Sequence, residues 1–181
     1  LHDRDGNGLH TIRYGRMPQG DARNLCEGLG ADVMALLAKR PGLKVATLCD
    51  GAAELWNLLS EPLGEEALGT EVHKVVDLWH LLEKLGRAAG VIHGSGSADE
   101  VVQRWRLRLL NSSRAAEGIL KELKQSGREH VQVGDARPVH DAITYIENNG
   151  DRMDYATARR RGLPVGSGNV EATCKSLVEV R

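Results

Sequence analysis

Two short apolar stretches, each with an aspartate at or near its end, constrain the fold of this chain more than any other feature of its sequence. The first is LKVATLCD, residues 43–50, and the second is VHKVVDLWH, residues 72–80. Nearly continuous apolar runs of this length are typical of strands buried in a parallel sheet. Gly51 turns the chain after the first run, and AAELWNLL predicts a helix between the two. Strand, helix and strand in this order predict a right-handed crossover in a parallel sheet.

Helical spacing of apolar residues dominates the rest of the chain. A helix is predicted from Leu25 to Leu37, and Pro41 with Gly42 ends it. Residues 81–150 contain no convincing strand and predict a wholly helical insertion, whose apolar positions are Leu81, Leu82, Leu85, Ala88, Ala89, Val101, Trp105, Leu109, Ile119, Leu120, Leu123, Val139, Ala142, Ile143 and Ile146. The stretch from Val101 to Leu123 suits one long helix or a pair.

The opening residues 1–18 predict two short strands around an Asp-Gly-Asn-Gly turn. Asp3, Asp5 and Asn7 also match the start of a calcium-binding loop. In such a loop the twelfth position carries a bidentate glutamate, but this chain has Tyr14 there. A plain hairpin turn is therefore the favoured interpretation.

Composition limits the classes of protein to consider. An apolar fraction of 41% supports a core, and a formal charge of −1 does not mark a general nucleic-acid binder, although QRWRLRLL and ARRRG leave room for a local basic patch. Three scattered cysteines, Cys26, Cys49 and Cys174, form no disulfide or zinc pattern and favour reduced thiols in the cytoplasm. No stretch reaches membrane-spanning length, and we expect no membrane partner.

Asp50 and the pair Asp77 and His80 follow the two predicted strands. In open parallel sheets ligands gather beyond the carboxyl ends of the strands, where Asp50 is well placed to hold a metal. The alternative, which local sequence favours, is that Asp50 caps the helix that begins at Gly51. Asp77 can orient His80 in support of a metal site, or the pair can simply hold a strand-to-helix junction, which local sequence again favours.

Glu171 stands in the first turn of the last predicted helix, after the loop GLPVGSGNV. The loop could let backbone N–H groups approach phosphate. Glu171 could be a metal ligand on a rigid helix, or a first-turn glutamate favoured by the helix dipole with Lys175 as its ion-pair partner. Two-metal phosphoryl transfer needs about three converging carboxylates, and Asp50 and Glu171 suit two of those places.

Three segments together resemble a known family: CDGAAELWNLL, VVDLWHLLEKL and the C-terminal RMDYATARRRGLPVGSGNVEATCKSLVEVR. Their order and spacing are similar to those of bacterial insertion-sequence transposases of the Kra-four group, which belong to the DDE class. The resemblance spans nearly the whole chain. It implies an α/β fold: a ribonuclease-H-like mixed sheet with flanking helices and an all-helical insertion before the last helix.

The resemblance also implies domains and residue roles. Residues 1–80 would form the first part of the core, residues 81–150 the insertion, and residues 151–181 the last core helix. Asp50 and Glu171 match the second catalytic aspartate and the catalytic glutamate, which would hold two Mg²⁺ ions, with Mn²⁺ as a substitute. Asp77 and His80 match a pair that supports the active site, and the candidates for contacts with DNA phosphates are Arg159, Arg160, Arg161 and Lys175.

The implied activity is Mg²⁺-dependent DNA strand cleavage and strand transfer in the cytoplasm, at the nucleoid, on transposon-end and target DNA. A homo-oligomer on DNA is expected. The family's first catalytic aspartate precedes the hairpin, while this chain begins with Leu1 at about that hairpin, and Arg181 falls inside a helical pattern. We therefore expect a fragment that is inactive alone.

Two alternatives to the transposase core stay open. One is a noncatalytic DNA-binding or assembly remnant of an insertion element. The other is an unrelated α/β protein in which the acidic residues are helix caps.

Overall fold

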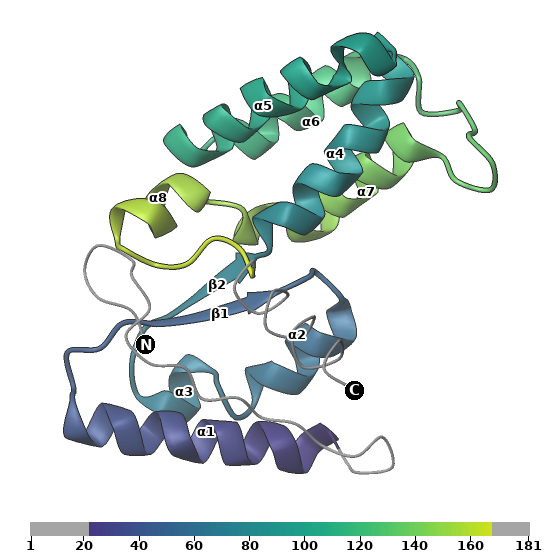
Figure 1. Ribbon diagram of the computed structural model, residues 1–181. Helices are drawn as coiled ribbons and strands as arrows, with labels where there is room; N and C mark the ends of the chain where they lie inside the picture. Colours follow the sequence, from purple (N-terminus) through teal and green to yellow (C-terminus); the bar gives the residue numbers. More distant parts are fainter. Residues whose placement is uncertain (1–21, 168–181) are drawn as a thin grey trace, which may run out of the picture. The chain divides into compact units, whose positions relative to one another are not determined.

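The computed structural model describes residues 22–167, and the chain divides into two compact units, Leu1–Lys74 and Val75–Arg181 (Figure 1). The hairpin predicted for residues 1–18 and the last helix, with Glu171 and Lys175, lie outside the described residues. The predicted domain ranges stay a prediction. Each unit is described by itself.

The first unit contains helices around one strand: α1 (Ala22–Lys39), β1 (Val45–Cys49), α2 (Ala53–Ser60) and α3 (Glu65–Leu68). The predicted first helix, first strand and following helix are thus confirmed. Gly51 has φ of 92°, a conformation that residues with a side chain rarely adopt, and it makes the predicted turn between β1 and α2.

The core of the first unit is small. Leu63, Leu68 and Val72 are its buried centre, and the partly buried residues packed against them are Leu29, Val33, Leu37, Val45 and Leu59. The helical spacing of the apolar residues in α1 places one face of that helix on this cluster.

A second strand, β2 (Val72–Val76), pairs with β1 in a two-stranded parallel sheet. The parallel strands and the helical content confirm the α/β class. The division between the two units falls within β2, after Lys74. The strand is shorter than the apolar pattern of residues 72–80 indicated, because Asp77 caps a helix that begins at Leu78 and contains His80.

Helices alone make up the described remainder of the second unit: α4 (Leu78–His93), α5 (Ser95–Asn111), α6 (Ala115–Gln125), α7 (Pro138–Asn149), the 3₁₀ turn η1 (Gly150–Arg152) and α8 (Tyr155–Arg160). Within residues 81–150 only an isolated bridge joins Val133 to Ala136, so the predicted helical character of this stretch is confirmed, while its place as an insertion stays a prediction. Val101 to Leu123 form a pair of helices, since the backbone of Ser112 is extended and ends α5.

The second unit has the larger core. α4 packs against α5 and α7, α6 against α7, and α8 against α5 (Figure 1). Almost every predicted apolar position is buried, and several are fully so, among them Leu81, Leu85, Ala88, Ala89, Ile119, Leu123, Val139 and Ala142. Burying a Leu or Ile side chain contributes roughly 1.5–3 kcal/mol, which explains why apolar periodicity predicted these helices well.

A polar contact joins α5 and α6 beside this core. The buried Trp105 donates from its indole Nε1 to Glu122 Oε2 at 2.7 Å, and Arg108 forms an ion pair with the same carboxylate. Burial alone would raise the pKa of Glu122. The hydrogen bonds from Arg108 and Trp105, with the charges of Arg108 and Arg104, outweigh burial and hold the pKa below its usual value of 4.5.

Candidate functional site

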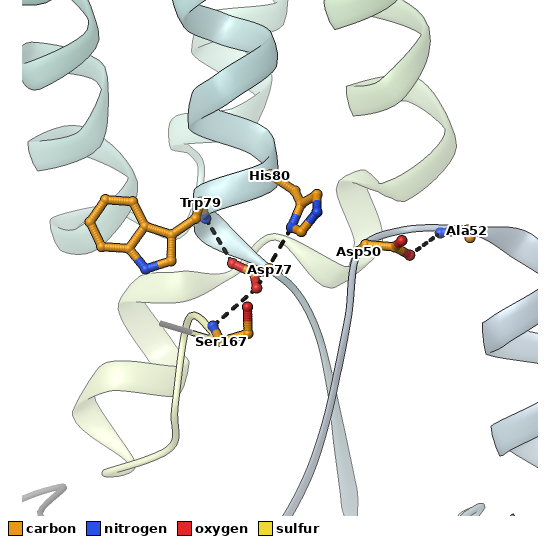
Figure 2. A network of polar contacts seen from close by, with 6 residues as sticks. All are labelled: Asp50, Ala52, Asp77, Trp79, His80 and Ser167. Carbon is orange, nitrogen blue, oxygen red and sulfur yellow. Dashed lines mark hydrogen bonds and ion pairs between the residues drawn. The ribbon is translucent and has the colours of Figure 1, made fainter. Parts of the chain in front are cut away.

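Asp50 directly follows β1 and carries an exposed carboxylate. Its Oδ1 accepts a hydrogen bond from the backbone N–H of Ala52 at 2.9 Å, which closes the turn at Gly51 (Figure 2). The position at the carboxyl end of a parallel strand is the one predicted for it.

The alternative that Asp50 caps the following helix is wrong in its geometry. Helix α2 begins at Ala53, two residues later than predicted, and its N-cap is Ala52, which makes no side-chain capping bond. Asp50 instead forms a local turn, because its acceptor reaches the amide only two residues ahead.

Asp77 follows β2 and has a different environment. Only 2% of it is exposed, and both oxygens of its carboxylate accept backbone hydrogen bonds. Oδ1 accepts from Trp79 N–H at 2.8 Å, the usual capping bond of an aspartate at the start of a helix. Oδ2 accepts from Ser167 N–H at 3.0 Å, across 90 residues of sequence (Figure 2).

The segment from Val165 to Ser167 is therefore held against the first turn of α4. Besides the Asp77 bond, the backbone N–H of Leu78 donates to Val165 O at 2.9 Å. Gly166 lies against the indole of Trp79, and a Cβ built on Gly166 would be 2.8 Å from Trp79 Cδ1 and Nε1. We call these contacts the α4 latch. It uses the Ser167 amide, one of the loop amides expected to approach phosphate.

His80 lies one turn along α4 from Asp77, as the spacing predicted. Its Nδ1 is 3.7 Å from Asp77 Oδ2, which is too long for a hydrogen bond. Among the described residues no group makes a hydrogen bond to this buried nitrogen. The observed role of Asp77 is therefore to accept hydrogen bonds from two backbone amides, and its role in supporting an active site through His80 stays a prediction.

Tyr155, at the start of α8, is fully buried close to Asp77. Burial raises the pKa of its phenol, and electrostatic interactions with Tyr145 and Asp77 raise it further. Within residues 22–167 the hydroxyl has no hydrogen-bond partner. Tyr155 thus stays neutral in the core and places a large aromatic ring beside the latch.

Three of the predicted DNA-contact residues lie in the described part of the chain, a few residues before the latch segment. Arg159 and Arg160 end α8, Arg161 follows it, and all are exposed. Arg160 donates from Nη2 to Thr157 Oγ1 at 2.7 Å. Arginine side chains commonly contact phosphate oxygens, and the predicted contacts of these residues with DNA stay a prediction.

A divalent metal would need more acidic ligands than the described residues bring together. Within residues 22–167 no group of three or more His, Cys, Asp or Glu side chains could hold a metal ion. Asp50 offers oxygen atoms, the ligand type that Mg²⁺ prefers, but it is one ligand. Glu171 lies outside the described residues, so the predicted Mg²⁺ site stays a prediction.

Three features of the site escaped the sequence interpretation: the Ser167 amide as a partner of Asp77, the contact of Gly166 with Trp79, and the buried Tyr155. A glycine in GSG did signal close packing or an unusual turn, but it did not name the partner. The apolar spacing of YATA was a weak signal for Tyr155, because α8 is only six residues long.

Comparisons with known proteins add no relative. No family model, no curated protein and no solved structure matches the chain. Among the helices of residues 22–167, none is both long and apolar enough to span a membrane.

Proposed function

We propose that the chain is part of the catalytic core of a DDE transposase, which cleaves DNA strands and transfers them to new DNA. Asp50 and Glu171 act as its catalytic, metal-binding carboxylates. The observation that carries the proposal is the exposed carboxylate of Asp50 at the carboxyl end of β1, within the family-like segment CDGAAELWNLL. Asp50 is exposed and does not cap α2, and carboxylate oxygens are the type of ligand that Mg²⁺ prefers.

The α4 latch supports a role for the segment that leads to Glu171. Ser167 is tied to Asp77, at the end of β2, and Glu171 follows Ser167 by only four positions in the sequence. A short segment between Glu171 and the residue bonded to the buried Asp77 is what a site needs if its acid must stay near the end of a strand.

In such a site two Mg²⁺ ions would activate the attacking oxygen and stabilise the leaving oxygen of the phosphodiester. The residues of this chain have simpler tasks. Asp50 and Glu171 hold negative charge where cations must bind, Asp77 fixes the latch, and Arg159, Arg160, Arg161 and Lys175 contact DNA phosphates.

The test is strand transfer by the full-length protein with Mg²⁺, comparing wild type with Asp50→Ala and Glu171→Ala. Loss of a residue that hydrogen-bonds to a metal ligand lowers metal affinity or activity about 10–100-fold. Loss of a ligand itself should therefore lower strand transfer at least ~100-fold. Glu54→Ala is the matched control, since Glu54 is an exposed acid in the first turn of α2 and has no predicted role.

Retained activity in Asp50→Ala or Glu171→Ala would contradict the assignment. Binding of transposon-end DNA by a full-length protein that transfers no strand would favour the noncatalytic remnant instead. Unchanged thermal unfolding of each variant serves as the folding control.

A further inference from the structure

Trp79 is the largest apolar side chain that the described residues leave exposed. Its exposed fraction is 48%, whereas Trp56 is 7% and Trp105 is 1% exposed. Burying a tryptophan ring is among the largest apolar contributions to the stability of a small core, so tryptophan rings are usually buried. A half-exposed tryptophan that the fold also holds in place therefore points to a ligand.

The surroundings of Trp79 restrict its position. Its backbone N–H is bonded to the buried Asp77, and Gly166 leaves no room for even a methyl group against the indole edge. Figure 2 shows the Trp79 indole and the His80 imidazole on opposite sides of the start of α4. The ring is thus held at its edge by the latch, while about half of its surface meets solvent.

A cation accompanies the ring. The guanidinium carbon of Arg106, on α5, is 5.7 Å from the centroid of the Trp79 ring, within cation–π range. Among residues 22–167 no carboxylate forms an ion pair with Arg106, in contrast to Arg108, which is paired with Glu122. The Nε of Arg106 is buried and has no hydrogen-bond partner in the described part of the chain. Within residues 22–167, no ion pair neutralises the charge of Arg106.

The side chains around Trp79 suit a ligand that is both anionic and aromatic better than they suit the surface of another protein. α8, which packs against α5, ends in the exposed Arg159 and Arg160. The exposed apolar residue next to Arg106 is Leu107, and successive residues of a helix point about 100° apart, so Leu107 does not extend the ring into a broad apolar face. One aromatic ring with arginines from two packed helices suits a nucleotide, whose base stacks and whose phosphate is attracted.

We propose that Trp79 and Arg106 form a stacking platform for an unpaired base of a DNA strand. The choice of DNA rests on the proposed function. Base–aromatic stacking tolerates any base, because every base has a π face, so the platform should require an unpaired base and no particular sequence. The exposed arginines would add attraction to the backbone that weakens with salt.

The experiment is a titration of the full chain with a thymidine oligonucleotide, followed by tryptophan fluorescence. A blunt DNA hairpin of equal phosphate number, with a non-nucleotide linker in place of loop bases, is the paired control. The buried Trp56 and Trp105 provide a constant background, so quenching reports Trp79. Affinities of Trp79→Leu, Trp79→Phe, Arg106→Gln and Leu107→Ala are measured by anisotropy of a labelled oligonucleotide.

We expect the single strand to quench the fluorescence and the hairpin to quench it far less. Trp79→Leu should weaken single-strand binding about 5- to 100-fold, since it keeps apolar bulk but loses the π face. Trp79→Phe should recover most of the affinity, Arg106→Gln should weaken binding and flatten its salt dependence, and Leu107→Ala should match wild type. Wild-type affinity in Trp79→Leu, or equal losses in Trp79→Leu and Leu107→Ala, would overturn the proposal.

Failure of the platform and failure of the proposed function give different results. If Asp50→Ala and Glu171→Ala keep strand transfer while Trp79→Leu loses single-strand affinity, the assignment of these two acids as catalytic residues falls and the platform stands. If Trp79→Leu binds normally while Asp50→Ala abolishes strand transfer, the platform falls alone.

Discussion

Asp50 and Asp77 share one local pattern, a short strand, an aspartate and then a helix, yet their environments differ in kind. Asp50 is exposed and bonds an amide two residues ahead. Asp77 is 2% exposed and bonds one amide at its own helix start and another 90 residues away. The difference teaches that one local pattern can leave a carboxylate exposed to solvent or bury it, and that tertiary contacts decide which. The buried Asp77 becomes part of the framework.

Replacement of Asp77 by alanine should give the largest effect on stability. It leaves two backbone amides without their carboxylate acceptor, and each lost bond to a charged group costs about 1.5–3 kcal/mol, so we expect a loss of about 3–6 kcal/mol in the free energy of unfolding. Asp50→Ala should cost less than about 1 kcal/mol, because water can take the exposed amide's bond. Urea denaturation of both variants measures the contrast.

Asp77→Asn refines this prediction. The asparagine amide keeps the size of the side chain and one oxygen, so it can accept one of the two hydrogen bonds. The loss of unfolding free energy in Asp77→Asn should therefore lie between the losses in Asp50→Ala and Asp77→Ala. The comparison would break if Asp50→Ala and Asp77→Ala destabilised the protein equally.

Gly166→Ala should have the next largest effect, since it attacks the latch from its other side. The added methyl group must push the Trp79 indole aside, and overpacking of this kind costs roughly 1–3 kcal/mol, with the low end expected for a half-exposed ring. Hydrogen exchange at the Ser167 and Leu78 amides should accelerate.

A double-mutant cycle isolates the contact. Trp79→Ala should remove most of the penalty of Gly166→Ala, because the methyl group then has room. Gly90→Ala is the control, since a Cβ at Gly90 meets no atom within 4 Å. Additive effects of Gly166→Ala and Trp79→Ala would show that the latch does not depend on this contact.

Glu122 is a carboxylate of intermediate burial, between the exposed Asp50 and the buried Asp77. Its replacement should have the smallest effect on stability. Its folded pKa lies below the usual 4.5, so the carboxylate stabilises the fold above that pH, and the stabilisation disappears as pH falls through the folded pKa. The difference in stability between wild type and Glu122→Gln should therefore shrink on acidification below about pH 4.5. Thermal unfolding from pH 7 to pH 3 measures it, and a difference that stays constant would contradict the ion pair with Arg108.

Much of the fold followed from the sequence because its signals are local. Apolar residues at helical spacing located the faces of α1, α4 and α7, and Gly51 announced a turn that needs a positive φ. The end of β2 was less predictable. VHKVVDLWH stays apolar through the junction, and only the capping bond of Asp77 shows where the strand stops.

The sequence by itself determined the longer helices, the strands β1 and β2 and the acidic residue that follows each, because periodicity and turn chemistry act over a few neighbouring residues. Only the tertiary structure decided that Asp77 is buried, that its second oxygen receives the Ser167 amide, and that Arg106 lies over Trp79. A backbone amide can donate to any acceptor, and a tryptophan can meet any cation. Packing of segments distant in sequence therefore selects the partner, and no local pattern records that choice.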